Sequence, residues 1–167
     1  MTRKIADRLA AGIKRLQPVV ADAKTRDVGE ADTAIIVTEI LADVLGYDKF
    51  KEITSELAIK GTYCDLAIKL DGKVILIIEV KAIGFELKDA HAKQAVDYAA
   101  NQGIEWVVLT NAVQWRMYAV TFGQPIGHDL VEELDFLGLN PKTEADLESL
   151  YLFTKEALTK SVLEEYQ

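Results

Sequence analysis

The sequence has 167 residues, enough for one domain with a sizeable hydrophobic core, and half of them are hydrophobic, as in a globular protein. The net charge of −8 argues against a general nucleic-acid coating protein, and no apolar run is long enough for a transmembrane helix. The single cysteine, Cys64, excludes an internal disulfide and is typical of a cytoplasmic protein. We therefore expect one cytoplasmic domain over residues 1–167 that makes no membrane contact.

Two helices are predicted before the first strand. The hydrophobic residues of the first, residues 3–17, recur at helical spacing: Ile5, Leu9, Ile13 and Leu16. Pro18 is expected to end or kink this helix. Residues 30–45 give the clearest helical pattern, because Gly29 precedes it, acidic residues occupy its first turn, and Gly46 follows it.

A strand over residues 52–59 is predicted to lead into a β-hairpin, and the hairpin carries the polar residues of most interest. Its turn is Asp71-Gly72, a strong hairpin signal between two β-rich runs. The second run, Val74–Val80, is apolar on both alternating faces until Glu79. That pattern indicates a strand buried on both sides.

Two acids and a lysine are predicted to meet at the end of this hairpin. Strand alternation places Glu79 and Lys81 on one face, and a two-residue turn places Asp65 opposite Ile78, one step from Glu79. A buried charge without a partner costs several kcal/mol, and neighbouring carboxylates repel unless one is protonated or a cation binds. The alternative is a salt bridge between Lys81 and one of the acids at a solvated strand end.

A helix over residues 86–102 follows. Its expected buried side consists of Leu87, Ala90, Ala95, Tyr98 and Ala99. It should cross over to the strand Trp106–Thr110, which would run parallel to the preceding strand, and Gln114–Val120 should form a further strand. Asp129–Phe136 fits a short strand or a turn, and residues 144–166 form an acidic helical segment.

The order Asp65, then Glu79-x-Lys81 on the next strand, resembles the core of the PD-(D/E)xK nuclease superfamily, with Cys64 where the superfamily's name has proline. Four further segments extend the likeness: Gly29-Glu30-Ala31-Asp32-Thr33, Leu45-Gly46-Tyr47, Gln94-x-x-x-Tyr98, and Leu109-Thr110-Asn111 before Trp115. This ordered set, a core of about residues 28–120, resembles the N-terminal nuclease domain of type I restriction enzyme R subunits.

The resemblance implies an α/β fold with a restriction-endonuclease-like mixed β-sheet flanked by helices. It also implies a Mg²⁺- (or Mn²⁺-) dependent DNA endonuclease in which Asp65, Glu79 and Lys81 are catalytic. The metal would be bound by Asp65, Glu79, the Val80 carbonyl and Glu30. Lys81 would orient the attacking water or neutralise charge on the phosphate; alternatively it forms a structural ion pair with Glu79.

The helical pattern also selects Glu30 over Glu39. Glu30 lies on the side of the apolar stripe of its helix, which runs through Val37, whereas Glu39 lies on the opposite side. The alternative is that Glu30 only complements the helix dipole.

The resemblance assigns Gln94 and Tyr98, four residues apart on one helix face, to substrate binding; alternatively Tyr98 packs against the sheet. It implies DNA and other restriction-system subunits as partners, and leaves homo-oligomer formation open. No Walker spacing occurs, so no ATP-driven motor is expected. The alternative function is a catalytically silent nuclease-fold module that binds DNA or a protein.

Overall fold

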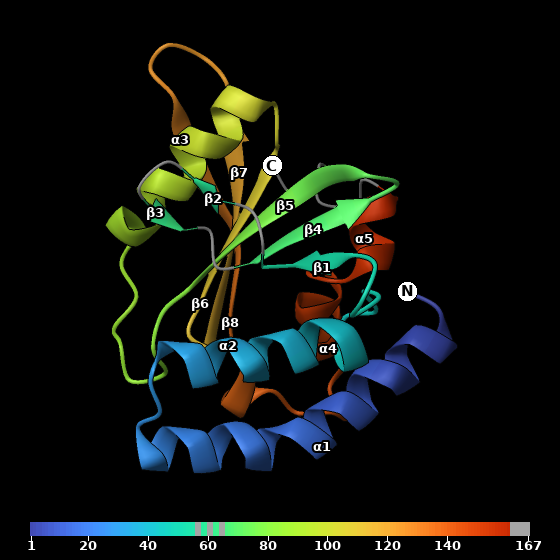
Figure 1. The fold of residues 1–167 in the computed structure, drawn as a ribbon. Coiled ribbons are helices and arrows are strands. Elements are labelled where there is room, and N and C mark those ends of the chain that lie inside the picture. Colours follow the sequence, from blue (N-terminus) through green and yellow to red (C-terminus); the bar gives the residue numbers. More distant parts are fainter. Residues whose placement is uncertain (56–57, 60–61, 64–65, 161–167) are drawn as a thin grey trace.

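The computed structural model describes residues 1–55, 58–59, 62–63 and 66–160. It has the expected α/β fold, a mixed sheet flanked by helices that is consistent with a restriction-endonuclease-like fold (Figure 1). In spatial order the sheet contains β1 (Ile53–Thr54), β4 (Leu66–Leu70), β5 (Lys73–Val80), β6 (Trp106–Thr110), β7 (Gln114–Thr121) and β8 (Gly127–Asp135). Strands β5 and β6 run parallel, and their other neighbours pair antiparallel, so the predicted crossover is confirmed.

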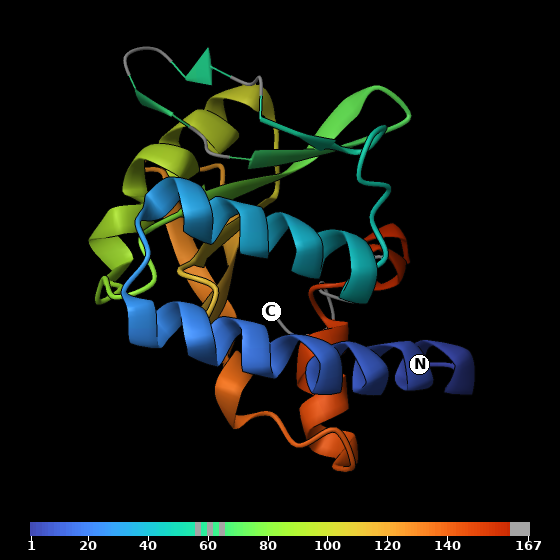
Figure 2. The same ribbon diagram turned by 60° about the horizontal axis from the view of Figure 1, so that its bottom comes forward.

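Helices cover both faces of this sheet (Figures 1 and 2). The helices α1 (Arg3–Arg26) and α2 (Glu30–Glu39) lie on one face, where the side chains of Ile78 and Val80 join the larger core. The opposite face, where Ile77 and Leu109 point, is covered by α3 (Lys93–Gln102). Because side chains alternate along a strand, Glu79 lies on the α3 face.

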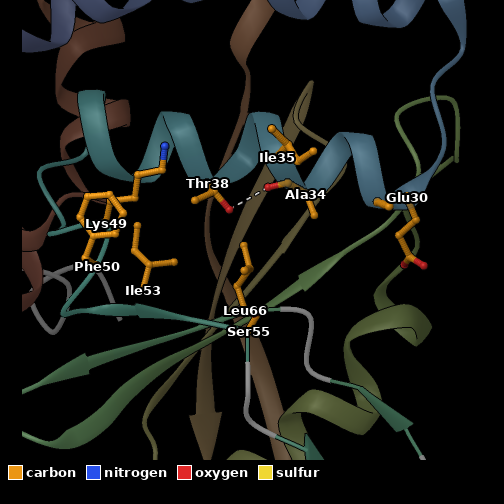
Figure 3. Close-up of a pocket in the computed structure, with 10 residues that line it drawn as sticks. Glu30, Ala34, Ile35, Thr38, Lys49, Phe50, Ile53, Ser55 and Leu66 are labelled. Atoms are coloured by element: carbon orange, nitrogen blue, oxygen red, sulfur yellow. Dashed lines mark hydrogen bonds between the residues drawn. The ribbon is translucent and has the colours of Figure 1, made fainter.

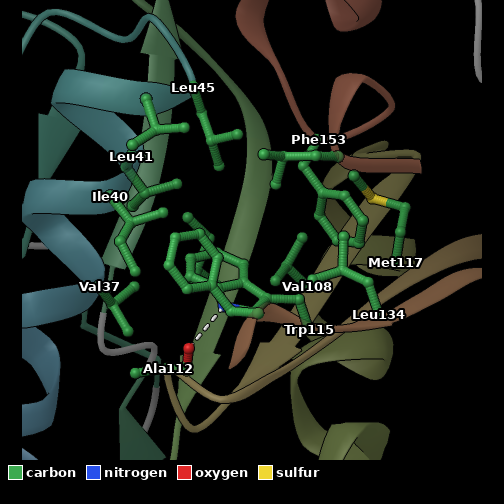
Figure 4. Packing of buried hydrophobic residues seen from close by; sticks show 14 of the residues in the cluster. Val37, Ile40, Leu41, Leu45, Val108, Ala112, Trp115, Met117, Leu134 and Phe153 are labelled. Carbon is green, nitrogen blue, oxygen red and sulfur yellow. Dashed lines mark hydrogen bonds between the residues drawn. The ribbon is translucent and has the colours of Figure 1, made fainter. Parts of the chain in front are cut away.

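The larger core is centred on Trp115 of β7, which lies between the sheet and α2 (Figure 4). Its indole is 1% exposed, near Leu41 and Phe153, and its Nε1 donates a hydrogen bond of 3.0 Å to the carbonyl of Ala112. Trp106 is buried as well. Both tryptophans therefore belong to the larger core.

Helix α1 extends beyond its predicted end at residue 17. It continues through Pro18 to Arg26, and its buried stripe continues at Val20 and Ala23. Pro18 is exposed, as is Lys14, whose carbonyl loses its helical partner to the proline. Water can therefore satisfy that carbonyl, while packing of the stripe holds the helix together.

The predicted helix over residues 30–45 is present but changes its winding. After α2 the chain forms a π-helical turn, Ile40–Val44, and it ends at Gly46, which adopts a φ of +89°. Helix α1 crosses this turn closely, because a β-carbon on Gly12 would collide with the side chain of Val44. Gly12 thus permits the close approach of the two helices.

The hairpin turn forms as predicted, but the register differs by one residue. Asp71 and Gly72 have φ values of +52° and +79°, as a two-residue hairpin turn requires. The structure pairs Ile78 with Leu66, so the prediction that Asp65 lies opposite Ile78 is wrong. At the step from Ile68 to Lys69 the partner strand advances by two residues, from Leu76 to Val74, so a bulge at Ile75 adds one residue to β5 and shifts the register.

Two other predicted elements have different boundaries. The strand over residues 52–59 is divided, because β1 pairs with β4 for two residues only and β2 (Ala58–Ile59) pairs instead with β3 (Thr62–Tyr63). The helix over residues 86–102 begins with a 3-10 turn, Asp89–Ala92. The tighter winding changes the buried face, so Ala92 is buried and Ala90 is exposed, contrary to expectation.

The C-terminal part contains a strand and two short helices. Asp129–Phe136, predicted as a strand or a turn, belongs mostly to β8. Within residues 144–160 the chain forms α4 (Glu144–Tyr151) and α5 (Lys155–Thr159), and the rest of the predicted helical segment lies outside the described residues. None of the helices in the described ranges is long and apolar enough to cross a membrane.

Candidate active site

Glu79 and Lys81 form an ion pair where β5 ends. The Lys81 Nζ lies 3.3 Å from the Glu79 Oε1, and the two side chains are 24% and 9% exposed, respectively. Strand β5 is paired on both sides, and this internal position buries the carboxylate. A buried acid held beside a lysine is thus the central feature of the candidate site, as the alternation of β5 predicted.

The neighbouring strand β6 fixes the backbone around this pair. The Lys81 amide donates to the Thr110 carbonyl at 2.9 Å, one residue beyond the end of β5. The Asn111 side chain donates to the carbonyl of Phe85 at 2.9 Å and accepts hydrogen bonds from the amides of Val113 and Gln114. The Thr110-Asn111 segment therefore holds the loop after Lys81 and the β6–β7 turn.

Asp65, the second predicted acid, lies outside the described residues, and its position relative to Glu79 is therefore not tested. It directly precedes Leu66, the partner of Ile78, while Glu79 directly follows Ile78. The observed register thus places Leu66 and Ile78, the sequence neighbours of the two predicted acids, opposite each other in one antiparallel pair.

The first turn of α2 contacts the segment that follows Lys81. The Oγ1 of Thr33, which is fully buried, accepts a hydrogen bond of 3.1 Å from the Ile83 amide and donates to the Gly29 carbonyl. Glu30, one helical turn before Thr33, is half-buried. This contact holds the start of α2, and with it Glu30, close to the end of β5.

Glu30 lines one end of a cleft of about 680 Å³ between α2 and β1 (Figure 3). Lys49 and Phe50 lie at the other end, and Leu66 forms part of the floor. The cleft opens on the α2 face of the sheet, whereas Glu79 lies on the α3 face. Glu30 could therefore reach the predicted metal only around the end of the strands.

Glu39 points away from this region, as predicted. Its carboxylate lies 3.5 Å from the guanidinium of Arg15 on α1, and its side chain is 41% exposed. The helical-face argument thus separates the two glutamates correctly, because Glu30 lines the cleft and Glu39 faces α1.

Gln94 and Tyr98, the predicted substrate-binding pair, lie on α3, on the same side of the sheet as Glu79. Gln94 is exposed in the first turn of α3, and Tyr98 is partly buried against the smaller core. Their helix thus covers the face of the sheet that carries Glu79, with Gln94 exposed on the helix, while Tyr98 also has a packing role.

A further polar cluster was missed by the sequence analysis. Arg116 of β7 lies 3.5 Å from Asp89 and 3.5 Å from Glu133, and the Tyr118 hydroxyl donates to Asp89 at 2.7 Å. Burial, together with the hydrogen bond to Asp89, raises the pKa of Tyr118 to about 12, so its hydroxyl keeps its proton. The alternation of Arg116 and Tyr118 along β7 is the sequence signal that places both on one face.

The residues present fit magnesium better than zinc. Within the described part of the chain, no group of three or more His, Cys, Asp or Glu side chains could hold a metal. Magnesium often binds through one or two carboxylates and keeps several waters, whereas structural zinc takes four nitrogen or sulfur ligands. The buried carboxylate of Glu79 is a donor of the kind that magnesium prefers.

Comparison with known families assigns the chain to a family. Residues 36–134 match the family model described as the N terminus of the type I restriction enzyme R protein. The chain belongs to this family. No curated protein and no solved structure shows a significant match.

The residues that match this R-protein family include most of the elements that build the candidate site. The matched range begins within α2 and runs through β4, β5, β6 and β7 to the penultimate residue of β8. It includes Glu79, Lys81, Gln94 and Tyr98, while Glu30 precedes it. The restriction-enzyme relationship predicted from the motifs is thereby confirmed.

Proposed function

We propose that this R-protein N-terminal domain is a Mg²⁺- or Mn²⁺-dependent endonuclease that hydrolyses phosphodiester bonds in DNA. The observation that supports it most is the Glu79 side chain, 9% exposed on a doubly paired strand, with the Lys81 Nζ 3.3 Å from its carboxylate. Burying two charged groups costs several kcal/mol even when they are paired, roughly as much as their attraction returns. A catalytic role would account for their retention, and it agrees with the PD-(D/E)xK likeness.

In this proposal Asp65 and Glu79 bind the metal, with the Val80 carbonyl as a further ligand and Glu30 reaching it directly or through a bound water. When bound, the ion lowers the pKa of a water ligand and stabilises negative charge on the attacked phosphate. The donor set consists of oxygen atoms only, as magnesium prefers.

Lys81 would orient the attacking water and neutralise charge that develops on the phosphate. Its backbone is fixed by the hydrogen bond to Thr110, so its side chain starts from a defined position beside Glu79. Metal binding to the Glu79 carboxylate would weaken the Glu79–Lys81 attraction and leave the ammonium group available for the substrate.

DNA is the proposed substrate, and Gln94 and Tyr98 would contact it from α3. Other subunits of a restriction system, or a second copy of the chain, are proposed partners. They could supply the DNA affinity that a chain with a net charge of −8 does not favour.

The alternative, a nuclease-fold module that binds without cutting, is favoured by that net charge and by the closed Glu79–Lys81 pair. Nicking of a supercoiled plasmid with Mg²⁺, with EDTA, and with Asp65→Ala separates the two functions. An endonuclease nicks with Mg²⁺ only, and the variant is inactive. Equal nicking by wild type and variant, or none by either, would contradict the proposal.

A further inference from the structure

A row of side chains crosses the sheet from the candidate site on its α3 face. The observed registers place Glu79 opposite Leu109, Leu109 opposite Arg116, and Arg116 opposite Glu133. Directly opposed residues point to the same face, so Arg116 lies on the face of Glu79, two strands away. Two strand spacings correspond to about 10 Å.

The 3-10 turn before α3 is fixed over this row. Asp89 accepts the hydrogen bond from Tyr118 and lies 3.5 Å from Arg116, so its charge is compensated by those groups. Two residues later, His91 accepts a hydrogen bond of 2.9 Å from the Lys88 amide through Nδ1. A neutral His91 therefore carries its hydrogen on Nε2 and can donate it to a ligand.

Three positively charged side chains act on His91, although the chain as a whole is acidic. Burial lowers the pKa of His91, and the positive charges of Lys81, Lys88 and Arg116 lower it further. The imidazole stands against Phe85, with ring centroids 4.8 Å apart, which fixes its orientation. Lys81 is paired with Glu79, and Arg116 with Asp89 and Glu133, so Lys88 would contribute most of the attraction for an anion beside His91. Such an anion would raise the pKa of His91 again.

We propose that Lys88 and His91, with Arg116 behind them and Lys81 beside them, bind a backbone phosphate of DNA next to the phosphate that is cleaved. The inference rests on the proposed function. Phosphates recur every 3.4 Å or so of helix axis along one DNA strand, so a strand at Glu79 carries others within reach of this cluster. His91 would donate through Nε2, and Lys88, which is exposed, would contribute charge.

The first test measures binding of a fluorescent duplex oligonucleotide in EDTA at several salt concentrations. Lys88→Gln should weaken binding and reduce the slope of log K against log salt by about 1, the effect of one lost phosphate contact. His91→Gln should weaken binding severalfold. Lys142→Gln, an exposed lysine before α4, is the matched control and should bind as wild type does. Equal binding by all four proteins, or no binding by wild type, would overturn the proposal.

The second test follows His91 by NMR during pH titration, with and without the duplex. The pKa of His91 should rise when DNA is bound, whereas the ring signals of His128, which packs against Tyr118, should stay in place when the duplex is added at fixed pH. An unchanged pKa of His91, equal signal changes at both histidines on addition of the duplex, or a response to inorganic phosphate but not to DNA would overturn the proposal. The two inferences can fail separately. Cleavage of DNA without the effects of Lys88 and His91 on binding would contradict only the phosphate-binding cluster. Those effects on binding without any cleavage would contradict only the proposed endonuclease activity.

Discussion

The hydroxyl of Thr33 accepts a hydrogen bond from the amide of Ile83 and so joins the start of α2 to the loop that follows Lys81. Both residues are buried, at 0% and 2% exposure, so water cannot replace the hydroxyl if it is removed. This hydrogen bond fixes the helix that carries Glu30 against the loop that follows the strand of Glu79.

Thr33→Val should therefore lower the free energy of unfolding by about 1–3 kcal/mol, because it leaves the buried Ile83 amide without its acceptor. It should also reduce Mg²⁺-dependent cleavage. Thr38→Val is the matched control, since the Thr38 hydroxyl only donates to the Ala34 carbonyl one turn earlier. Urea unfolding of both variants measures the difference, and equal losses would show that the Thr33 contact has no special role.

Glu30→Gln should lower the rate of Mg²⁺-dependent cleavage by about tenfold or more, because it removes one of the proposed ligand charges. Glu39→Gln should cleave at nearly the wild-type rate, since that side chain faces Arg15 on α1. Initial rates of plasmid nicking compare the two. A larger loss in Glu39→Gln would refute the assignment of Glu30.

Gly12→Val should destabilise the protein by about 1–3 kcal/mol through overpacking against Val44, although valine is the better helix former. Ala11→Val, on the exposed side of the same helix, should destabilise by only about 0.5 kcal/mol, the cost of the lower helix propensity of valine. Thermal unfolding reports both changes. Increased stability of Gly12→Val would mean that α1 and the π-helical turn are not in close contact.

The ion pair between Arg8 and Glu156 should make stability depend on pH. Two hydrogen bonds of 2.8 Å join them, and the bond to Arg8 lowers the pKa of Glu156 in the folded state. A lowered folded-state pKa contributes stability that is present above the unfolded-state pKa of about 4.3 and is lost as pH falls through the folded-state value.

Glu156→Gln should accordingly be less stable than wild type at pH 7, and the difference should disappear in acid. Asp43→Asn removes one acidic partner of Arg15, in an exposed pair whose side chains are 47% and 52% exposed, and should have little effect at either pH. Denaturant unfolding across the pH range measures this. A constant deficit of Glu156→Gln at every pH would contradict the role of its charge.

Strand periodicity and turn chemistry were sufficient to predict the centre of the fold and part of the site. The Asp71-Gly72 turn and the alternation of β5 predicted the hairpin and the shared face of Glu79 and Lys81. The apolar stripe of α2 likewise separated Glu30 from Glu39. Both patterns are local, because each depends only on residues close together in the sequence.

What the sequence did not predict depends on contacts between distant segments. The bulge at Ile75 changes the register, and no turn residue marks it. The persistence of α1 beyond Pro18 depends on the core that its later residues join. The cluster of Asp89, Arg116 and Tyr118 forms only when the 3-10 turn folds over β7.

The most direct test of the account is cleavage of a supercoiled plasmid by wild type and Glu79→Gln at equal concentration, with Mg²⁺ and with EDTA. Glu148→Gln, which changes an exposed glutamate of α4, is the control for a change of charge alone. We predict that wild type and Glu148→Gln nick the plasmid only with Mg²⁺, and that folded Glu79→Gln does not. Nicking by Glu79→Gln at the wild-type rate, or no Mg²⁺-dependent nicking by wild type, would contradict the account.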